Sequence, residues 1–367
     1  MGHANRDTGG YRGRRTITDV LKFIATALAV VVALVLAGVF YLQRYIVYTD
    51  EGTRLELPPF LEMFRRENRE PNGASSLPDP SDVSVVIDPD GSLSEPVPEE
   101  PREAGYVLEL PVSDVTGGAA AAKLAEAGAG ALVLQVKDSS GQLAWHSDLF
   151  AADWSEVNAP QSNNEALKQW NDGEVYTIAR VCCFRDDSVP YSMNALALRR
   201  GEYNWRDELG LRWLSPAQDD AQAYIAGLCG ELAALGFDEI VLEQFHFPTR
   251  GNLENIKRGD RYDPDRFTSE LRDFLDQVQQ AVEPYDTVVS LRVERDTLAG
   301  EETVSGVTAP LLEQYAHRIW VEEDGALPAP LDLLRQAGIT GGAERLVSIA
   351  AERGDGGAVT QAVFAES

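Results

Sequence analysis

The chain has 367 residues, of which 44% are hydrophobic, so it is long and apolar enough for a sizeable core in one large domain. Its formal net charge of -27 would repel a phosphate backbone, which excludes nonspecific nucleic-acid binding. The three cysteines include an adjacent pair and no Cys-x-x-Cys spacing, so neither a disulfide framework nor a zinc site is expected.

Residues 23–42 read FIATALAVVVALVLAGVFYL, an uncharged run long enough to cross a hydrocarbon core of about 30 Å. Arginines and a lysine dominate residues 1–22, and by the positive-inside rule this flank stays in the cytoplasm. A cleaved signal peptide is the alternative, but the run is longer than a usual signal core and ends in an aromatic belt. We therefore expect a single-pass anchor in the cell membrane, with the rest of the chain extracytoplasmic.

Residues 43–105 follow as an acidic, proline-rich stretch, which from about Arg65 to Gly105 lacks the apolar periodicity of a packed domain. We interpret it as a largely disordered stalk. The predicted organisation is a cytoplasmic N-terminus (1–22), a transmembrane helix (23–42), the stalk (43–105) and one folded domain (106–367).

After Gly105, apolar runs alternate with helix-like stretches, which is typical of βα units around a parallel sheet. The predicted strands are Tyr106–Pro111, Ala131–Lys137, Val175–Val181, Glu239–Gln244, Thr287–Val293, Arg318–Val321, Arg345–Ile349 and Ala358–Phe364. The predicted helices are Ala119–Ala127, Asn164–Trp170, Pro216–Leu235, Asp263–Val282, Pro310–Tyr315 and Ala329–Ala337.

Seven or eight such units favour an α/β fold of the (β/α)8 TIM-barrel type over an open doubly wound sheet. No strand ends in a Gly-x-Gly-x-x-Gly or phosphate-loop sequence, so no nucleotide cofactor is expected. The stretch between Ile349 and Ala358 is too short for a full helix, which predicts an irregular closure of the barrel or a hairpin.

Polar residues at the carboxyl ends of the predicted strands are the candidates for chemistry, because that end of a barrel carries the active site. Candidate catalytic residues are Glu243, Glu294 and Glu322, and candidate substrate-binding residues are Asp138, Arg180, His246 and Trp320. Carboxylates serve as acid, base or nucleophile around an oxocarbenium-like transition state, and aromatic faces, here also Trp145, Trp205 and Trp213, stack on sugar rings.

Each of these candidates also has a plainer interpretation. A buried arginine such as Arg180 needs a carboxylate partner and would form a structural ion pair, and His246 would cap its strand. No metal set is predicted, although Asp138, Asp186 and Glu243 carry the hard oxygen atoms that calcium prefers.

Several segments resemble the putative glycoside hydrolase barrel family of bacteria, which is of unknown function and distantly similar to the α-amylase clan. They are "LVLQVKDSSGQLAWHSDL", "VYTIARVCCFRDD", "WRDELGLRWLSPAQDDAQAYIAGLCGELAALGFDEIVLEQFHFP" and "VVSLRV". The resemblance covers about Tyr106 to Val293 and implies a carbohydrate-related barrel with an acidic residue at Glu243.

The chain departs from this family at two strands. Glu243, Gln244 and His246 replace the aspartate, tyrosine and arginine of the usual Phe-Asp-Tyr-x-Arg-Phe-Pro, and Trp320-Val-Glu-Glu-Asp324 replaces a Tyr-Pro-Ser-His-like signature. A carboxylate displaced by one methylene can lower a rate about 10²-fold.

Two functions stay open from the sequence. The first is an anchored extracytoplasmic glycoside hydrolase that acts on a cell-wall or environmental polysaccharide. The second is a catalytically inactive barrel that binds a glycan or a partner protein at the cell surface.

Overall fold

The computed structural model describes residues 46–49, 52–55, 105–302, 304–324, 328–354 and 360–364, and the chain divides into two units, Met1–Val97 and Pro98–Ser367. In the first unit, β1 (Ile46–Thr49) and β2 (Gly52–Leu55) pair as an antiparallel ribbon. The predicted transmembrane run 23–42 and most of the predicted stalk lie outside the described residues. None of the helices described elsewhere in the chain is long and apolar enough to cross a membrane.

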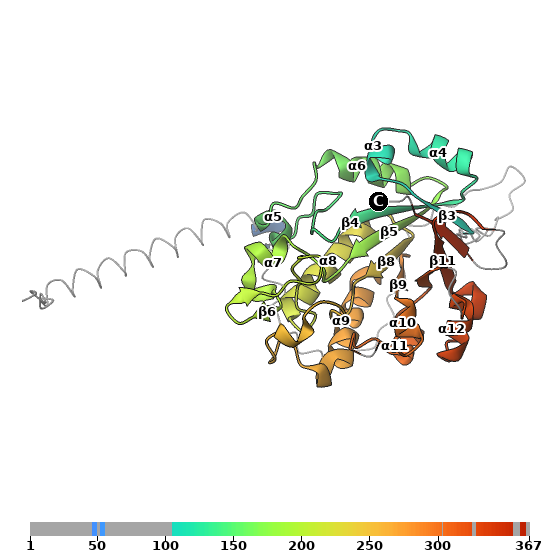
Figure 1. Cartoon of the computed structure of the whole chain (residues 1–367). Helices are drawn as coiled ribbons and strands as arrows, with labels where there is room; N and C mark the ends of the chain where they lie inside the picture. The colour runs from blue at the N-terminus through green and yellow to red at the C-terminus, as the bar shows by residue number, and fades with distance from the viewer. Residues whose placement is uncertain are drawn as a thin grey trace, which may run out of the picture. The chain divides into compact units, whose positions relative to one another are not determined.

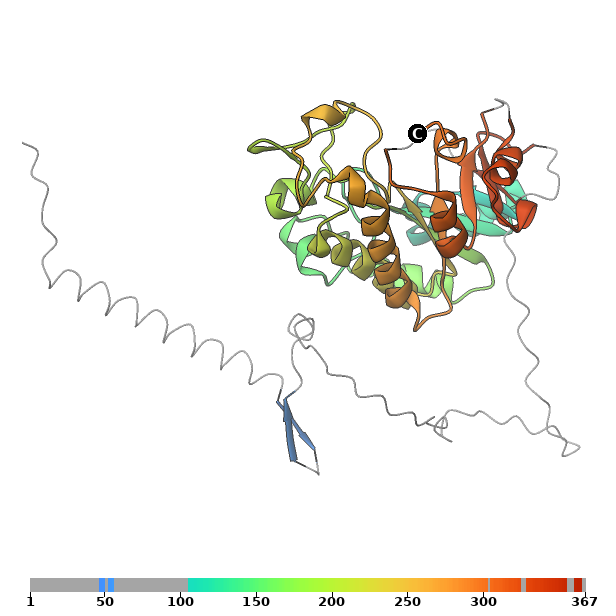
Figure 2. The ribbon, with the colours of Figure 1, turned by 90° about the horizontal axis from the view of Figure 1, so that it is seen from below.

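Eight parallel strands of the second unit close into a barrel, which confirms the predicted TIM-type architecture (Figures 1 and 2). They are β3 (Tyr106–Glu109), β4 (Ala131–Lys137), β5 (Tyr176–Cys182), β8 (Glu239–Glu243), β9 (Val288–Arg292), β10 (Ile319–Glu322), β11 (Leu346–Ala350) and β12 (Thr360–Val363). Each lies within about two residues of its predicted position.

Helices surround the barrel, and α8 and α9 lie side by side on its outside (Figure 1). The helices are α3 (Val112–Thr116), α4 (Ala120–Ala127), α5 (Phe150–Trp154), α6 (Ser162–Asn171), α7 (Val189–Ser192), α8 (Asp219–Ala234), α9 (Phe267–Val282), α10 (Arg295–Leu298), α11 (Ala309–Tyr315) and α12 (Pro330–Gln336). In α9 the buried residues Phe267, Leu271, Phe274 and Val278 recur every three or four positions, which places one apolar face on the barrel. A small antiparallel hairpin, β6 (Arg199–Arg200) and β7 (Tyr203–Asn204), lies in the long connection between β5 and α8.

The barrel closes through β12, and here the alternative of a hairpin is wrong. A hairpin would make β12 antiparallel to β11, whereas β12 runs parallel to both β11 and β3. The last strand therefore completes a regular parallel barrel.

Alternation along the strands determines which side chains enter the barrel. In β8, Val241 packs with the interior cluster, whereas Ile240 and Leu242 pack with the large core beneath the helices. Because side chains alternate with a period of two, Glu239 and Glu243 lie on the interior face with Val241. One strand thus places a carboxylate at each end of the barrel interior.

Candidate active site

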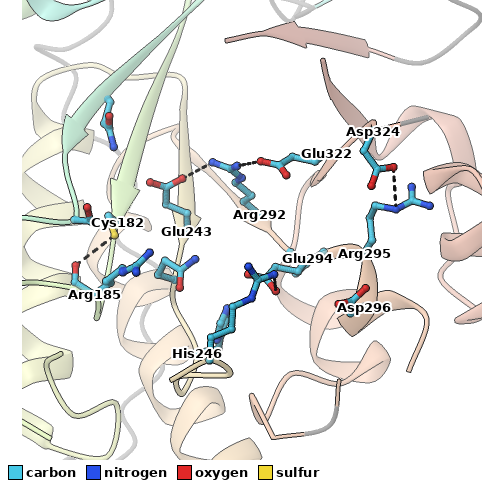
Figure 3. A pocket seen from close by; sticks show the side chains of 15 residues that line it. Cys182, Arg185, Glu243, His246, Arg292, Glu294, Arg295, Asp296, Glu322 and Asp324 are labelled. Carbon is cyan, nitrogen blue, oxygen red and sulfur yellow. Dashed lines mark hydrogen bonds and ion pairs between the residues drawn. The ribbon is translucent and has the colours of Figure 1, made fainter. Parts of the chain in front are cut away.

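The carboxyl ends of β4, β5, β8, β9 and β10 surround a pocket of about 540 Å³ at the mouth of the barrel (Figure 3). Gln135, Cys182, Glu243, Arg292 and Glu322 line it from these five strands, and the following loops add further polar groups. None of its lining residues is a phenylalanine, tyrosine or tryptophan. The pocket is therefore a polar site dominated by guanidinium and carboxylate groups.

Glu243 lies in this pocket with its side chain 10% exposed. Its Oε2 accepts hydrogen bonds from Arg180 Nη1 at 3.1 Å and Arg292 Nη1 at 2.8 Å. Its Oε1 forms no hydrogen bond within the part of the chain that the structure describes. One oxygen therefore fixes the carboxylate, and the other is available to a bound molecule.

Glu243 is the centre of a network in which carboxylates and guanidinium groups alternate across the mouth. Arg180 also contacts Glu109 of β3. Arg292 also contacts Glu322 of β10, as Figure 3 shows. Burial alone would lower the pKa of Arg180, but Glu243 and Glu109 together raise it, so this guanidinium stays charged. Burial raises the pKa of Glu109, although Arg180 opposes that effect.

The backbone turns sharply directly after Glu243. Gln244 has φ 49°, a left-handed conformation that non-glycine residues adopt rarely and at a cost of about 1–3 kcal/mol. Both Gln244 and the next polar residue, His246, line the pocket. Strain at this position, next to the pocket's most buried carboxylate, is the kind of feature that clusters at functional sites.

His246 is 4% exposed, and its Nδ1 lies 2.7 Å from the carbonyl oxygen of Phe247. A carbonyl only accepts, so Nδ1 carries the proton and the neutral ring keeps a lone pair on Nε2. Burial lowers the pKa of His246, although the Phe247 carbonyl and Glu294 act in the opposite direction. The ring is thus set up as a neutral acceptor.

The remaining predicted carboxylates lie nearer the rim of the pocket. The Glu294 side chain is 32% exposed and pairs with the exposed Arg250 at 3.2 Å. The Glu322 side chain is 64% exposed and pairs with Arg292. Figure 3 shows both side chains around the same pocket as Glu243.

Asp138 and Trp320 are placed differently from the prediction. Asp138 Oδ1 accepts hydrogen bonds from the backbone N–H groups of Ser140 at 2.9 Å and Gln142 at 3.0 Å, and Asp138 does not line the pocket. Its carboxylate therefore stabilises its own turn.

Trp320 is fully buried inside the barrel, where its Nε1 donates to Glu239. A ring without an exposed face cannot stack on a sugar, so its predicted role in substrate binding is wrong. The other proposed aromatic platforms, Trp145, Trp205 and Trp213, are also buried in the core.

Lys137 does not reach the mouth either. Its Nζ lies 2.9 Å from Asp186 Oδ2, both side chains are fully buried, and Nζ donates to the Cys182 carbonyl at 2.7 Å. Burial alone would lower the pKa of Lys137, but Asp186 helps to raise it, so the pair is ionic. This pair lies beside the site as a structural support.

Glu109 is the network member that the sequence reasoning missed. Its signal was an acidic side chain at the end of an apolar strand, two positions after the interior residue Val107. Within the described ranges, no group of three or more His, Cys, Asp or Glu side chains is arranged to hold a metal ion.

Part of the chain matches the model of a known family. Residues 121–303 match the family described as a putative glycosyl hydrolase domain. The match includes Arg180, Glu243, Arg292 and Glu294, and it excludes Glu109 and Glu322. No curated protein matches the chain.

Several solved structures resemble the chain weakly. A hypothetical protein from Ruminiclostridium thermocellum is 23% identical, with a TM-score of 0.43, and the match covers 50% of this chain and 96% of that one. The PgaB (BpsB) glycoside hydrolase domain from Bordetella bronchiseptica is 13% identical, with a TM-score of 0.45 and coverage of 67% and 84%. The α-galactosidase AgaA from Geobacillus stearothermophilus is 10% identical, with a TM-score of 0.47 and coverage of 72% and 39%. The fold assignment rests on the strand pairing itself.

Proposed function

We propose that the chain is a glycoside hydrolase that cleaves a cell-wall or environmental polysaccharide at the mouth of its barrel. The observation that carries the proposal is Glu243, a carboxylate with one fixed and one available oxygen, inside the segment that matches the glycosyl hydrolase domain. The pocket around it, about 540 Å³, is large enough for sugar units.

The roles of the carboxylates follow from their surroundings. Glu243 acts as nucleophile or base, because Arg180 and Arg292 orient it through Oε2 and leave Oε1 for the reaction. Glu294 is the better proton donor, because among the described residues it pairs with the exposed Arg250 alone, whereas Glu322 pairs with Arg292 of the network. Glycoside hydrolysis needs such a pair of carboxyl groups on either side of the scissile bond.

His246 and Arg180 complete the proposal. His246 accepts a hydrogen bond from a sugar hydroxyl at Nε2, because Nδ1 already donates to the backbone. Arg180 positions Glu243 from below and does not itself contact the sugar, since it does not line the pocket and its two Nη atoms contact Glu109 and Glu243.

A second candidate is a non-catalytic barrel that binds glycan at the cell surface. The observation that favours it is the double ion pair at Glu243, which makes this residue resemble a structural partner of two arginines. The absence of aromatic residues from the pocket lining gives no preference, because a polar lining can bind hydroxyl groups in either case.

The anchor belongs to the proposal as well. Residues 23–42 would hold the enzyme in the membrane with the barrel outside the cell. Protease added to intact cells should then remove the barrel and leave a small protected N-terminal fragment. A barrel that survives protease until the cells are lysed would contradict this topology.

The activity is tested by incubating the full-length protein in detergent with a panel of neutral, acidic and amino-sugar polysaccharides. Release of new reducing ends from at least one polysaccharide is the expected result. Binding without any release would establish the second candidate. If the protein showed no binding and no release, both candidates would be excluded.

A further inference from the structure

A second pocket, of about 570 Å³, lies between the β6–β7 hairpin and the loop 257–261. These segments follow β5 and β8, so both belong to the end of the barrel that carries the mouth. The backbone N–H of Lys257 donates to the Arg199 carbonyl at 2.6 Å and joins the two segments. The two pockets share no lining residue.

Cationic side chains dominate this second pocket. Arg199, Lys257, Arg258 and Arg261 line it, against the carboxylates of Glu202 and Asp260. Most other described arginines pair with a carboxylate, as Arg180, Arg206 and Arg212 do. None of the four cations of this pocket forms an ion pair with any carboxylate that the structure describes.

Neutral acceptors hold two of these guanidinium groups in place. Arg261 Nη1 donates to the carbonyl oxygens of Asn194 at 3.2 Å and Ala197 at 3.3 Å. Arg199 donates to the side chain of Asn204 and to the carbonyl oxygen of Glu202. Carbonyl and amide groups orient the charges without neutralising them, and the four cations of the lining outnumber its two carboxylates.

The negative charge of the whole chain does not cancel this local field. At physiological ionic strength, charges are screened beyond about 8 Å, so an approaching anion responds mainly to the nearest side chains. A group of unpaired cations in a protein with net charge -27 is therefore a specific feature of this surface.

We propose that this surface, formed by Arg199, Lys257, Arg258 and Arg261, binds the carboxylate groups of an acidic polysaccharide. The proposal rests on the glycoside hydrolase function and narrows its substrate class to acidic polymers. The polymer would be held at this surface while another of its units occupies the mouth. Guanidinium groups recognise carboxylates through paired N–H donors, which neutral glycans cannot exploit.

The test measures binding of the full-length protein to polygalacturonate, with neutral dextran as the reference polymer. The wild-type protein should bind polygalacturonate, lose affinity as salt is raised, and ignore dextran. Replacing two exposed unpaired cations, Lys257→Ala with Arg258→Ala, should weaken binding about threefold to tenfold, because each exposed charge pair contributes less than about 1 kcal/mol.

The matched control is Lys168→Ala with Arg272→Ala. These two side chains are also exposed, lie on α6 and α9, and form no ion pair with the described carboxylates, so the control changes the net charge equally. Equal weakening in both variants would show a general charge effect and overturn the proposal. Absence of wild-type binding would overturn it as well.

The assay measures binding and needs no turnover, so its result stands whether or not the hydrolase proposal fails. In one further arm, anionic phosphatidylglycerol vesicles replace the polymer. The Lys257→Ala, Arg258→Ala variant is measured on both. If it loses more binding to vesicles than to the polymer, the surface recognises a lipid headgroup and the proposal is contradicted.

Discussion

The two ends of β8 carry the same residue type in two different settings. Glu239 at the base is fully buried, and both its oxygens are used: Trp320 Nε1 donates to Oε1, while Arg318 and the Tyr176 hydroxyl contact Oε2. Glu243 at the mouth meets two cations, Arg180 and Arg292, but only through Oε2. The base carboxylate therefore uses both of its oxygens within the protein, whereas the mouth carboxylate uses one.

This difference assigns a structural role to Glu239 and a functional role to Glu243 on the same strand. A buried ion pair contributes little net stability but becomes costly when one partner is removed. At the base, Arg318, Tyr176 and Trp320 all contact Glu239. At the mouth, Arg180 keeps Glu109 and Arg292 keeps Glu322 if Glu243 is lost, so the network tolerates a change at its centre.

The largest stability loss is expected at the base. Glu239→Gln removes the charge that Arg318 and Tyr176 contact, and the free energy of unfolding should fall by about 3–5 kcal/mol. Urea denaturation measures this loss. Glu322→Gln at the exposed rim is the control and should change stability by less than about 1 kcal/mol. An equal loss in the free energy of unfolding for the two variants would contradict the distinction between a structural carboxylate at the base and replaceable carboxylates at the mouth.

A smaller loss of stability is expected at the buried ion pair of Lys137 and Asp186. Asp186→Asn leaves Lys137 charged without its carboxylate, but two backbone carbonyls still accept from Nζ, so the loss should be about 3 kcal/mol. Adding Lys137→Met removes the stranded charge. The double variant should recover part of the stability in the same urea assay, and a double variant less stable than Asp186→Asn alone would contradict the account.

The sequence predicted the eight strands because apolar runs and glycine-capped helices mark them locally. It also singled out Arg180, Glu243 and Glu294, since each is a polar residue in or just after a long apolar strand. Glu243 and Glu294 line the mouth pocket, and Arg180 pairs with Glu243. It missed Glu109. This residue could have been found by following the period-two alternation along the short strand β3, which places Glu109 on the same interior face as Val107.

The errors have a common physical origin. A period of two tells which face of a strand a side chain occupies, but not its height in the barrel, because height depends on the stagger between strands. Trp320 was therefore assigned to the rim although its indole reaches down to Glu239. Asp138 follows its strand directly, but the turn after it uses the carboxylate before any ligand can.

The smallest expected effect concerns pH. Burial lowers the pKa of His246 near the mouth and of His317 at the base below the usual 6.5. The histidines of the unfolded chain then bind more protons than those of the folded chain as pH falls below about 6.5, so their contribution to stability decreases from pH 7 to pH 5. His246→Asn should flatten this dependence more than His317→Asn, because His246 is buried whereas His317 is exposed. The measurement is the thermal midpoint of each variant between pH 5 and pH 7. If the midpoint of His246→Asn changed with pH as much as that of the wild type, the prediction would be contradicted.

The central claim is that Glu243 is the functional carboxylate of the mouth, and one measurement tests it most directly. The rate of reducing-end release by Glu243→Gln is compared with that of the wild type on the polysaccharide that the wild type cleaves. The account predicts a loss on the order of 10³-fold, with stability changed by less than about 1 kcal/mol because both arginines keep another partner. A variant that cleaves at the wild-type rate, or one that loses activity only because it unfolds, would contradict the assignment.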